Sequence, residues 1–196
     1  MLLELRNADN PAQVEYAAPL LLQRDGDLVA PDSFNAVLTL NNITGSRFYV
    51  SLRHRNHLGV ITATALDLKT VSPQTIDFSS PTTAVRGNHA RIVTQGVALL
   101  WAGDANHDEK IIYQGIGSDT IVLLRDILLA PDNTSGSSNY RLPGYLASDV
   151  TLDGYTVYAG PGSDSNRILG NVYLHPANTN TASNYIISGG LSGLVP

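Results

Sequence analysis

Cysteine is absent from the 196-residue sequence, which excludes disulfide bridges, thiolate zinc sites and cysteine nucleophiles. Charged residues are also scarce: they make up 15% of the chain, and 17 acidic against 12 basic residues leave a net charge of -5. Binding to nucleic acid or to an anionic membrane needs clustered Lys and Arg, so neither partner is expected, nor is membrane insertion. The 43% of hydrophobic residues is ordinary for a chain that buries a core.

Signals for export and for catalysis are missing as well. The chain starts on a strand-like segment, Met1 to Arg6, without the basic and apolar regions of a secretory leader, so a secreted form would be a mature or excised portion of a longer chain. A Gly-x-Ser-x-Gly nucleophile motif is not found, and the Gly-x-Gly runs at 115–117 and 160–162 are too short for phosphate loops. We therefore expect a protein that is not an enzyme.

Residues 1–98 are predicted to form a β-sandwich, because short apolar or alternating runs are separated by turn residues. Asp25-Gly26 is typical of a hairpin turn, and residues 42–46 supply another turn around Gly45. The predicted strands cover residues 2–6, 14–23, 36–41, 47–53 and 59–68.

The second half contains an internal repeat. When the chain is shifted by 45 residues, Trp101 to Asp119 aligns with Leu146 to Asp164, and eight of the nineteen aligned positions are identical. Unrelated segments would share about one, at roughly 5 to 7% identity by chance. We therefore predict a duplicated unit over residues 99–178. Residues 179–196 are expected to form a tail that ends in a short apolar strand or serves as a linker.

Each copy begins with a loop whose acidic residues are spaced like calcium ligands. Calcium takes six to eight oxygen ligands, and an EF-hand-like loop supplies side-chain oxygens at positions 1, 3 and 5 and a backbone carbonyl at position 7. In the first loop (residues 104–119) these are Asp104, Asn106, Asp108 and Lys110. In the second loop (residues 149–164) they are Asp149, Thr151, Asp153 and Tyr155. The pattern predicts two calcium ions.

The closing ligand of each loop departs from the standard pattern. Position 12, normally acidic, is Gly115 or Gly160, and the next acidic residue lies at position 16. We expect that Asp119 and Asp164 close the two sites. The Thr151 hydroxyl replaces the Asn106 amide oxygen, so the second site is expected to be the weaker one. Position 6, normally glycine for the sharp turn, is Gly154 in the second loop and Glu109 in the first, and Gly154 is expected to offset part of this difference.

A helix is predicted after each loop, with Asp119 and Asp164 as its N-cap residues. The apolar residues at helical spacing are Ile121, Leu124 and Leu128 in the first copy, and Ile168 and Val172 in the second.

Two further groups of residues have rival interpretations. Arg53 to His57 is the densest polar cluster. In a strand His54 and His57 would face opposite sides, so they could bind one metal ion only if the chain turned between them. A structural role between the two halves of the chain is therefore favoured. Trp101 and the tyrosines could form a sugar-binding surface, but Tyr113 and Tyr158 are equivalent in the repeat, which favours a place in the core.

At the two loops the chain resembles dockerin-type repeats, the paired calcium-loop-and-helix units of secreted bacterial proteins. The whole chain is similar to the C-terminal region of large bacterial surface proteins, in which a β-sandwich with an Arg-His-Arg-Asn-His-Leu run precedes a Trp-Ala-Gly-Asp loop and its second copy. These motifs lie at residues 53–58 and 101–104. Residues 42–51 are similar to prealbumin-like, carboxypeptidase-regulatory sandwiches. The resemblance implies a secreted or surface location and calcium as a structural ion.

The expected fold is therefore mainly β with a small α part, a β-sandwich followed by a duplicated dockerin-like domain. The expected function is a non-catalytic, calcium-binding module of a secreted or surface protein, serving adhesion, assembly or anchoring. Its partner would be another surface or scaffold protein, or a glycan. The alternative is a carbohydrate-binding module, which requires that Trp101 or a row of tyrosines be exposed.

Overall fold

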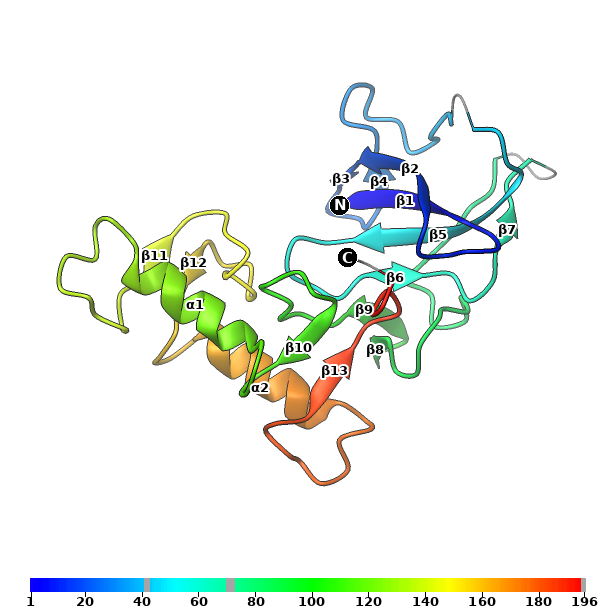
Figure 1. Ribbon diagram of the computed structural model, residues 1–196. Helices are drawn as coiled ribbons and strands as arrows, with labels where there is room; N and C mark the ends of the chain where they lie inside the picture. The colour runs from blue at the N-terminus through cyan, green and yellow to red at the C-terminus, as the bar shows by residue number, and fades with distance from the viewer. Residues whose placement is uncertain (41–42, 70–72, 195–196) are drawn as a thin grey trace.

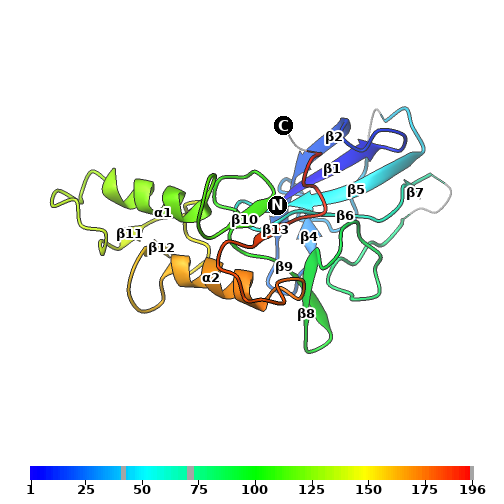
Figure 2. The same ribbon diagram turned by 60° about the horizontal axis from the view of Figure 1, so that its bottom comes forward.

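The computed structural model describes residues 1–40, 43–69 and 73–194. Within these residues the protein is mainly β with two short helices, α1 (Asp119–Leu128) and α2 (Asp164–Leu174), which confirms the predicted fold class at this level. The strands of the N-terminal half gather at one end of the molecule and the helices lie at the other, with β10 and β13 between them (Figure 1). Figure 2 shows the same division from a second side. Neither helix in the described part of the chain is long and apolar enough to cross a membrane.

The N-terminal half is built on a five-stranded antiparallel sheet in the order β2-β1-β5-β6, with β7 also paired to β5. Its strands are β1 (Leu2–Asn7), β2 (Val14–Pro19), β5 (Arg47–Arg53), β6 (Val60–Ile61) and β7 (Leu66–Asp67). Leu5 pairs with Val50 at its centre, and both side chains are buried in the N-terminal core. Two hairpins complete this half: β3 (Leu21–Leu22) with β4 (Leu28–Val29), and β8 (Arg91–Thr94) with β9 (Val97–Leu100).

Of the strand predictions, the one for β5 and the turn before β4 were correct, and others were right only in part. The bounds of β5 are those predicted, and the turn at Asp25-Gly26 connects β3 to β4, with Gly26 at φ +100°. The predicted strand 14–23 is interrupted at Leu20, and 59–68 is divided into β6 and β7. The strand predicted at 36–41 was wrong for residues 36–40, whose leucines pack on the core without pairing in a sheet; residues 41 and 42, in this strand and the following turn, lie outside the described residues.

In the C-terminal half the strands pair across the two copies of the repeat. β10 (Lys110–Ile112) pairs with β13 (Ile186–Ser188), and β12 (Tyr155–Thr156) pairs with β11 (Leu142–Pro143). Ile111 lies opposite Ile187, and Thr156 lies opposite Leu142. β10 and β12 are 45 residues apart, and so are β11 and β13, so the strand within each loop pairs with the last strand of the other copy. The tail predicted at 179–196 thus contains the short apolar strand, β13.

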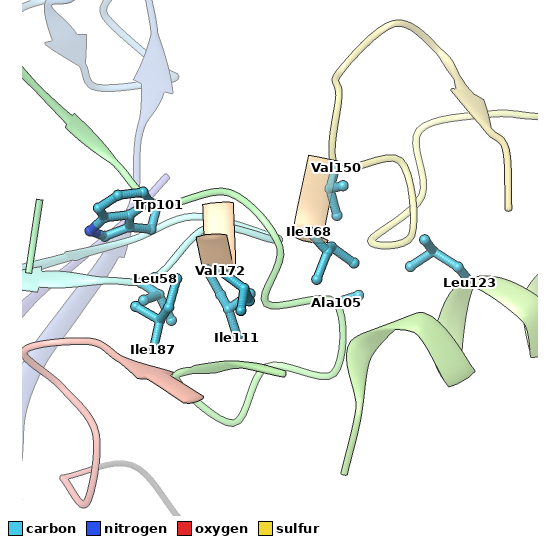
Figure 3. Close-up of a cluster of buried hydrophobic side chains, with 9 residues drawn as sticks. All are labelled: Leu58, Trp101, Ala105, Ile111, Leu123, Val150, Ile168, Val172 and Ile187. Atoms are coloured by element: carbon cyan, nitrogen blue, oxygen red, sulfur yellow. The ribbon is translucent and has the colours of Figure 1, made fainter. Parts of the chain in front are cut away.

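A second hydrophobic core joins the two copies to the N-terminal half (Figure 3). Leu123 from α1 and Ile168 from α2 contribute to it, and Leu58, which precedes β6, packs beside Trp101 in the same cluster. The cluster consists of Leu58, Trp101, Ala105, Ile111, Leu123, Val150, Ile168, Val172 and Ile187. The loops therefore lie against a core shared by both halves of the chain.

The face of α1 that packs on this core differs from the predicted one. Leu123 and Ile127 are fully buried, whereas Ile121 and Leu128 are 60% and 42% exposed. The helix carries two apolar stripes, and helical spacing alone does not say which stripe faces the core. In α2 the predicted residues, Ile168 and Val172, are the buried ones.

Candidate metal centre

The first loop is folded by side-chain oxygens that accept hydrogen bonds from its own backbone. The N–H of Asp108 donates to Asp104 Oδ1 and to Asn106 Oδ1, both at 3.0 Å. The N–H of Glu109 donates to Asp104 Oδ2 (3.1 Å), and that of Lys110 donates to Asp108 Oδ1 (3.0 Å). These bonds direct the oxygens of loop positions 1, 3 and 5 toward the inner side of a single turn.

The second loop repeats three of these four hydrogen bonds at positions 45 residues later. The N–H groups of Asp153 and Gly154 donate to Asp149 Oδ1 (3.2 Å) and Oδ2 (3.0 Å), and the N–H of Tyr155 donates to Asp153 Oδ1 (3.0 Å). At position 3 the Thr151 hydroxyl donates to Asp149 Oδ1 (3.4 Å), a bond without an equivalent at Asn106. The two loops therefore have the same frame although most of their residues differ.

Asp119 connects the first helix to the start of the first loop and to β10. Its Oδ1 accepts from the N–H groups of Ala105 (2.8 Å) and Asn106 (3.3 Å), and its Oδ2 accepts from that of Ile112 (2.8 Å). The side chain is fully buried. It is the first residue of α1, and Ser118 is the N-cap, so the N-cap prediction was wrong by one residue.

Asp164 occupies the same place in the second copy. Its two oxygens accept from the N–H groups of Thr151 (2.9 Å) and Val157 (2.8 Å), and its side chain is fully buried. Here too the preceding serine, Ser163, is the N-cap residue. The residues predicted to close the loops are thus brought against them, because each carboxylate accepts backbone N–H groups from the start of its loop and from position 9.

Both loops hold the backbone in the left-handed region at positions 4 and 6. These residues are His107 (φ +66°) and Glu109 (φ +60°) in the first loop, and Leu152 (φ +63°) and Gly154 (φ +87°) in the second. A residue other than glycine in this region costs about 1 kcal/mol or more, and such strain is concentrated at functional sites. The predicted need for glycine at position 6 applies to Gly154, whereas Glu109 adopts the same conformation with a full side chain.

Burial disfavours the charged form of several loop carboxylates. Burial, with the nearby Glu109 carboxylate, raises the pKa of Asp104 to about 7. Burial also raises the pKa of Asp119 to about 8, with the neighbouring Asp104 contributing, and the pKa of Asp164 is raised mainly by burial. The first loop therefore concentrates acidic groups in a place that would be stabilised by positive charge.

The carboxylates are close to the loop backbone but are not gathered into a cage. Among the described residues, no group of three or more His, Asp or Glu side chains is placed to hold a metal ion. The oxygens of Asp104 and Asp119 face N–H groups of the loop instead. Lys110 and Tyr155, the predicted carbonyl ligands, lie at the first positions of β10 and β12.

Two arginines of the segment 53–58 form ion pairs with the loops, which the sequence did not predict. Arg53 Nε lies 3.1 Å from Glu109 Oε1, and Arg55 Nη2 lies 3.5 Å from Asp149 Oδ2. The Arg55 guanidinium also lies over the Tyr145 ring, 3.4 Å from its centroid. The density of polar residues in this segment was the one signal that pointed to it. Its contacts lie at the boundary between the two halves, as the structural interpretation expected.

His54 and His57 contact each other rather than facing opposite sides of a strand. Their ring centroids are 4.5 Å apart in an edge-on arrangement, because the chain leaves β5 at Arg53 and bends. Burial lowers the pKa of His54 to about 4 and that of His57 to about 3, so both rings are neutral at pH 7.

Trp101 does not offer a surface to a sugar. Its side chain is 1% exposed, and its Nε1 donates to the backbone oxygen of His89 (2.8 Å). Tyr113 and Tyr158 pack against the C-terminal core.

Comparisons with known proteins found no match to this chain among family models, curated proteins or solved structures.

Proposed function

We propose that each of the two loops binds a structural calcium ion, and that the duplicated units are dockerin-like. The observation that carries this proposal is the recurrence, 45 residues apart, of one loop frame in which oxygens at positions 1 and 5 accept N–H groups of the same turn. The repeated positions keep their oxygen atoms, whereas positions 2, 4 and 6 differ between the copies. Such selective retention is what a shared ligand would require.

The donor atoms suit calcium. The first loop offers carboxylate oxygens from Asp104, Asp108 and Asp119, an amide oxygen from Asn106 and the carbonyl of Lys110, all of which are hard ligands. A carboxylate oxygen has two lone pairs, so an oxygen that accepts a backbone N–H can also contact an ion. A bound ion would thus add to the hydrogen bonds of the loop rather than replace them.

The electrostatics and the backbone support the same conclusion. A bound cation would offset the burial and mutual repulsion that raise the pKa of Asp104 and Asp119, and its binding would release their protons. It would also offset the strain at His107, Glu109 and Leu152, which costs about 1 kcal/mol or more per residue. Calcium therefore stabilises a loop that is unfavourable without it, and binding free energy becomes folding free energy.

We place this module in a secreted or surface-exposed protein, where it serves adhesion, assembly or anchoring. This setting rests on the resemblance of the two loops to dockerin-type repeats and on the calcium concentration outside cells, at which even loops of low affinity are filled. In this setting the ions hold the duplicated domain against the N-terminal half. The partner is another surface or scaffold protein.

Thermal unfolding in excess chelator and in about 1 mM calcium, a typical extracellular level, tests the proposal. Calcium should raise the melting temperature of the unchanged protein, and Asp104→Ala and Asp149→Ala should each remove part of the increase. Asp77→Ala is the matched control, because Asp77 accepts N–H groups from Ser79 and Ser80 in a similar turn outside the loops. An increase that survives both loop substitutions together would refute the assignment of these loops.

A further inference from the structure

One buried residue of the N-terminal half contacts both loops. Asn56 is 0% exposed, and its backbone oxygen accepts from the N–H groups of Gly103 (2.9 Å) and Asp104 (3.1 Å). Its side-chain Nδ2 donates to the backbone oxygens of Ala147 (3.0 Å) and Asp149 (2.5 Å). Asn56 therefore holds the first residue of each loop, one through its main chain and the other through its side chain.

The two contacted sites correspond in the repeat. Asp104 and Asp149 are equivalent under the shift of 45 residues, so Asn56 lies where the starts of the two loops meet. The amide oxygen of Asn56 is 2.8 Å from Nδ1 of His57, which fixes the orientation of its side chain. An asparagine suits this place because it carries two side-chain donors for two carbonyls and an acceptor at the same time.

Two neighbours of Asn56, Arg53 and Arg55, form ion pairs with the loops. Arg53 pairs with Glu109 of the first loop, and Arg55 pairs with Asp149 of the second. Leu58 N–H donates to the Trp101 oxygen (2.8 Å), three residues before the first loop. The segment 53–58 is thus fixed at several points to both loops, and it cannot shift at one loop without disturbing the other.

We propose that Asn56 couples the two loops, so that calcium in one loop raises the affinity of the other; this inference rests on the proposed calcium function. Calcium in the first loop orders the backbone around Asp104, and this fixes the Asn56 carbonyl that accepts its N–H group. The same residue supplies the side-chain N–H donor that bonds to the Asp149 carbonyl, so this donor is fixed as well. The entropy lost in ordering this bridge is lost at the first binding event and not again at the second. Positive coupling between the loops follows, and by linkage it acts equally in both directions.

Calorimetric titrations with calcium on four proteins test the coupling: the unchanged chain, Asp149→Ala, Asn56→Ala and the double variant. Asp149→Ala should weaken binding at the first loop about fivefold or more when Asn56 is present. In the Asn56→Ala background the same substitution should change it by less than about twofold. Equal effects in both backgrounds would overturn the inference. Asn178→Ala, which removes amide bonds to Val172 and Ala182 away from the loops, should preserve the coupling.

A second measurement keeps Asn56 intact in case Asn56→Ala does not fold. In Asp108→Ala, where the first loop lacks a ligand, calcium bound to the second loop should slow hydrogen exchange of the Gly103 and Asp104 amides that bond to Asn56. Unchanged exchange of both amides, with calcium bound, would overturn the inference. If the unchanged chain binds no calcium, the proposed function itself fails, whereas two independent sites would leave that function intact and refute the coupling alone.

Discussion

The two loops share a backbone frame and differ in the charges that surround it. In the first loop Asp104, at ligand position 1, has the acidic neighbours Glu109 and Asp108, and the arginine that contacts this loop, Arg53, pairs with Glu109 and not with Asp104. In the second loop, position 6 is Gly154, and Asp149 at position 1 already pairs with Arg55 at 3.5 Å. Hydrogen-bond geometry fixes the shape of such a loop, while neighbours from distant segments set how strongly it attracts a cation.

This comparison predicts that the first loop binds calcium more tightly. Cation binding relieves repulsion in the first loop, but in the second loop it must compete with the guanidinium of Arg55. The sequence also predicted that the second loop binds calcium more weakly, because Thr151 replaces Asn106 as a ligand. The structure adds a second cause, the positive charge of Arg55 beside Asp149. The predictions below separate these two causes.

The largest effect is expected from removing the carboxylates that join the loops to their helices. Asp119→Ala deprives three N–H groups of their acceptor, two of them in buried hydrogen bonds, and should lower the free energy of unfolding by about 3 kcal/mol. Asp164→Ala deprives two N–H groups of their acceptor, one of them in a buried hydrogen bond, and should cost about 2 kcal/mol. Urea denaturation in chelator measures both. A smaller loss for Asp119→Ala than for Asp164→Ala would contradict the stronger anchoring of the first loop.

The pH dependence of stability above about pH 6.5 should come from the buried loop carboxylates, chiefly those of the first loop. The ordinary pKa of Asp is 3.8, and in the folded protein that of Asp104 is raised to about 7 and that of Asp119 to about 8. Ionising these groups costs free energy in the folded state alone, so in chelator stability should fall by about 1 kcal/mol as the pH rises from about 6.5 to 8. His54 and His57 are neutral in the folded protein but titrate near pH 6.5 when unfolded, so they offset part of this fall at the lower end of the window.

Calcium should abolish this decline, because the ion requires ionised carboxylates. Melting temperatures across the pH range, with and without calcium, measure both effects. In Asp104→Asn the decline in chelator should be smaller. A stability that rises with pH in chelator would contradict the account of these buried acids.

Arg55→Gln should make the second loop resemble the first. Removal of the guanidinium frees Asp149 and should raise calcium affinity at the second loop about fivefold, or about 1 kcal/mol. The titration is best made in Asp104→Ala, where the first loop is disabled. Arg125→Gln is the control, because Arg125 pairs with Asp126 on the surface of α1. If affinity is unchanged by Arg55→Gln but rises in Thr151→Asn, the ligand difference is the cause.

The smallest effect is expected at position 6. Gly154→Ala places its Cβ in open space, so the cost is that of the left-handed backbone (φ +87°), about 1 kcal/mol or less. Glu109→Gly relieves the same strain in the first loop but removes the acceptor of the Gly59 N–H (2.8 Å) and the partner of Arg53. We therefore expect Glu109→Gly to be destabilising, and urea denaturation that finds it stabilising would show that strain outweighs these contacts.

The parts of this molecule that follow from local pattern could be read from the sequence. The alternation of Tyr49 to Arg53 predicted β5, and the repeat predicted both helices and the loop oxygens. Loop frames of this kind depend on residues two to five positions apart, such as Asp104 and Glu109, so their hydrogen bonds follow from spacing.

Other features depend on residues that are distant in sequence. Asn56 bonds to Asp149, and β10 pairs with β13, through contacts that no periodicity encodes. The core-facing side of α1 could not be chosen from spacing because both of its sides are apolar, and comparison with Ile168 in the second copy would have selected Leu123. The ion pairs of Arg53 and Arg55 were missed because their partners, Glu109 and Asp149, are far away along the sequence.

Calorimetric titration of calcium into the chelator-stripped protein tests the central claim most directly. The account predicts two binding events, with the tighter one removed by Asp104→Ala and the weaker one by Asp149→Ala. The absence of binding up to about 10 mM calcium, above the range of extracellular modules, would contradict it.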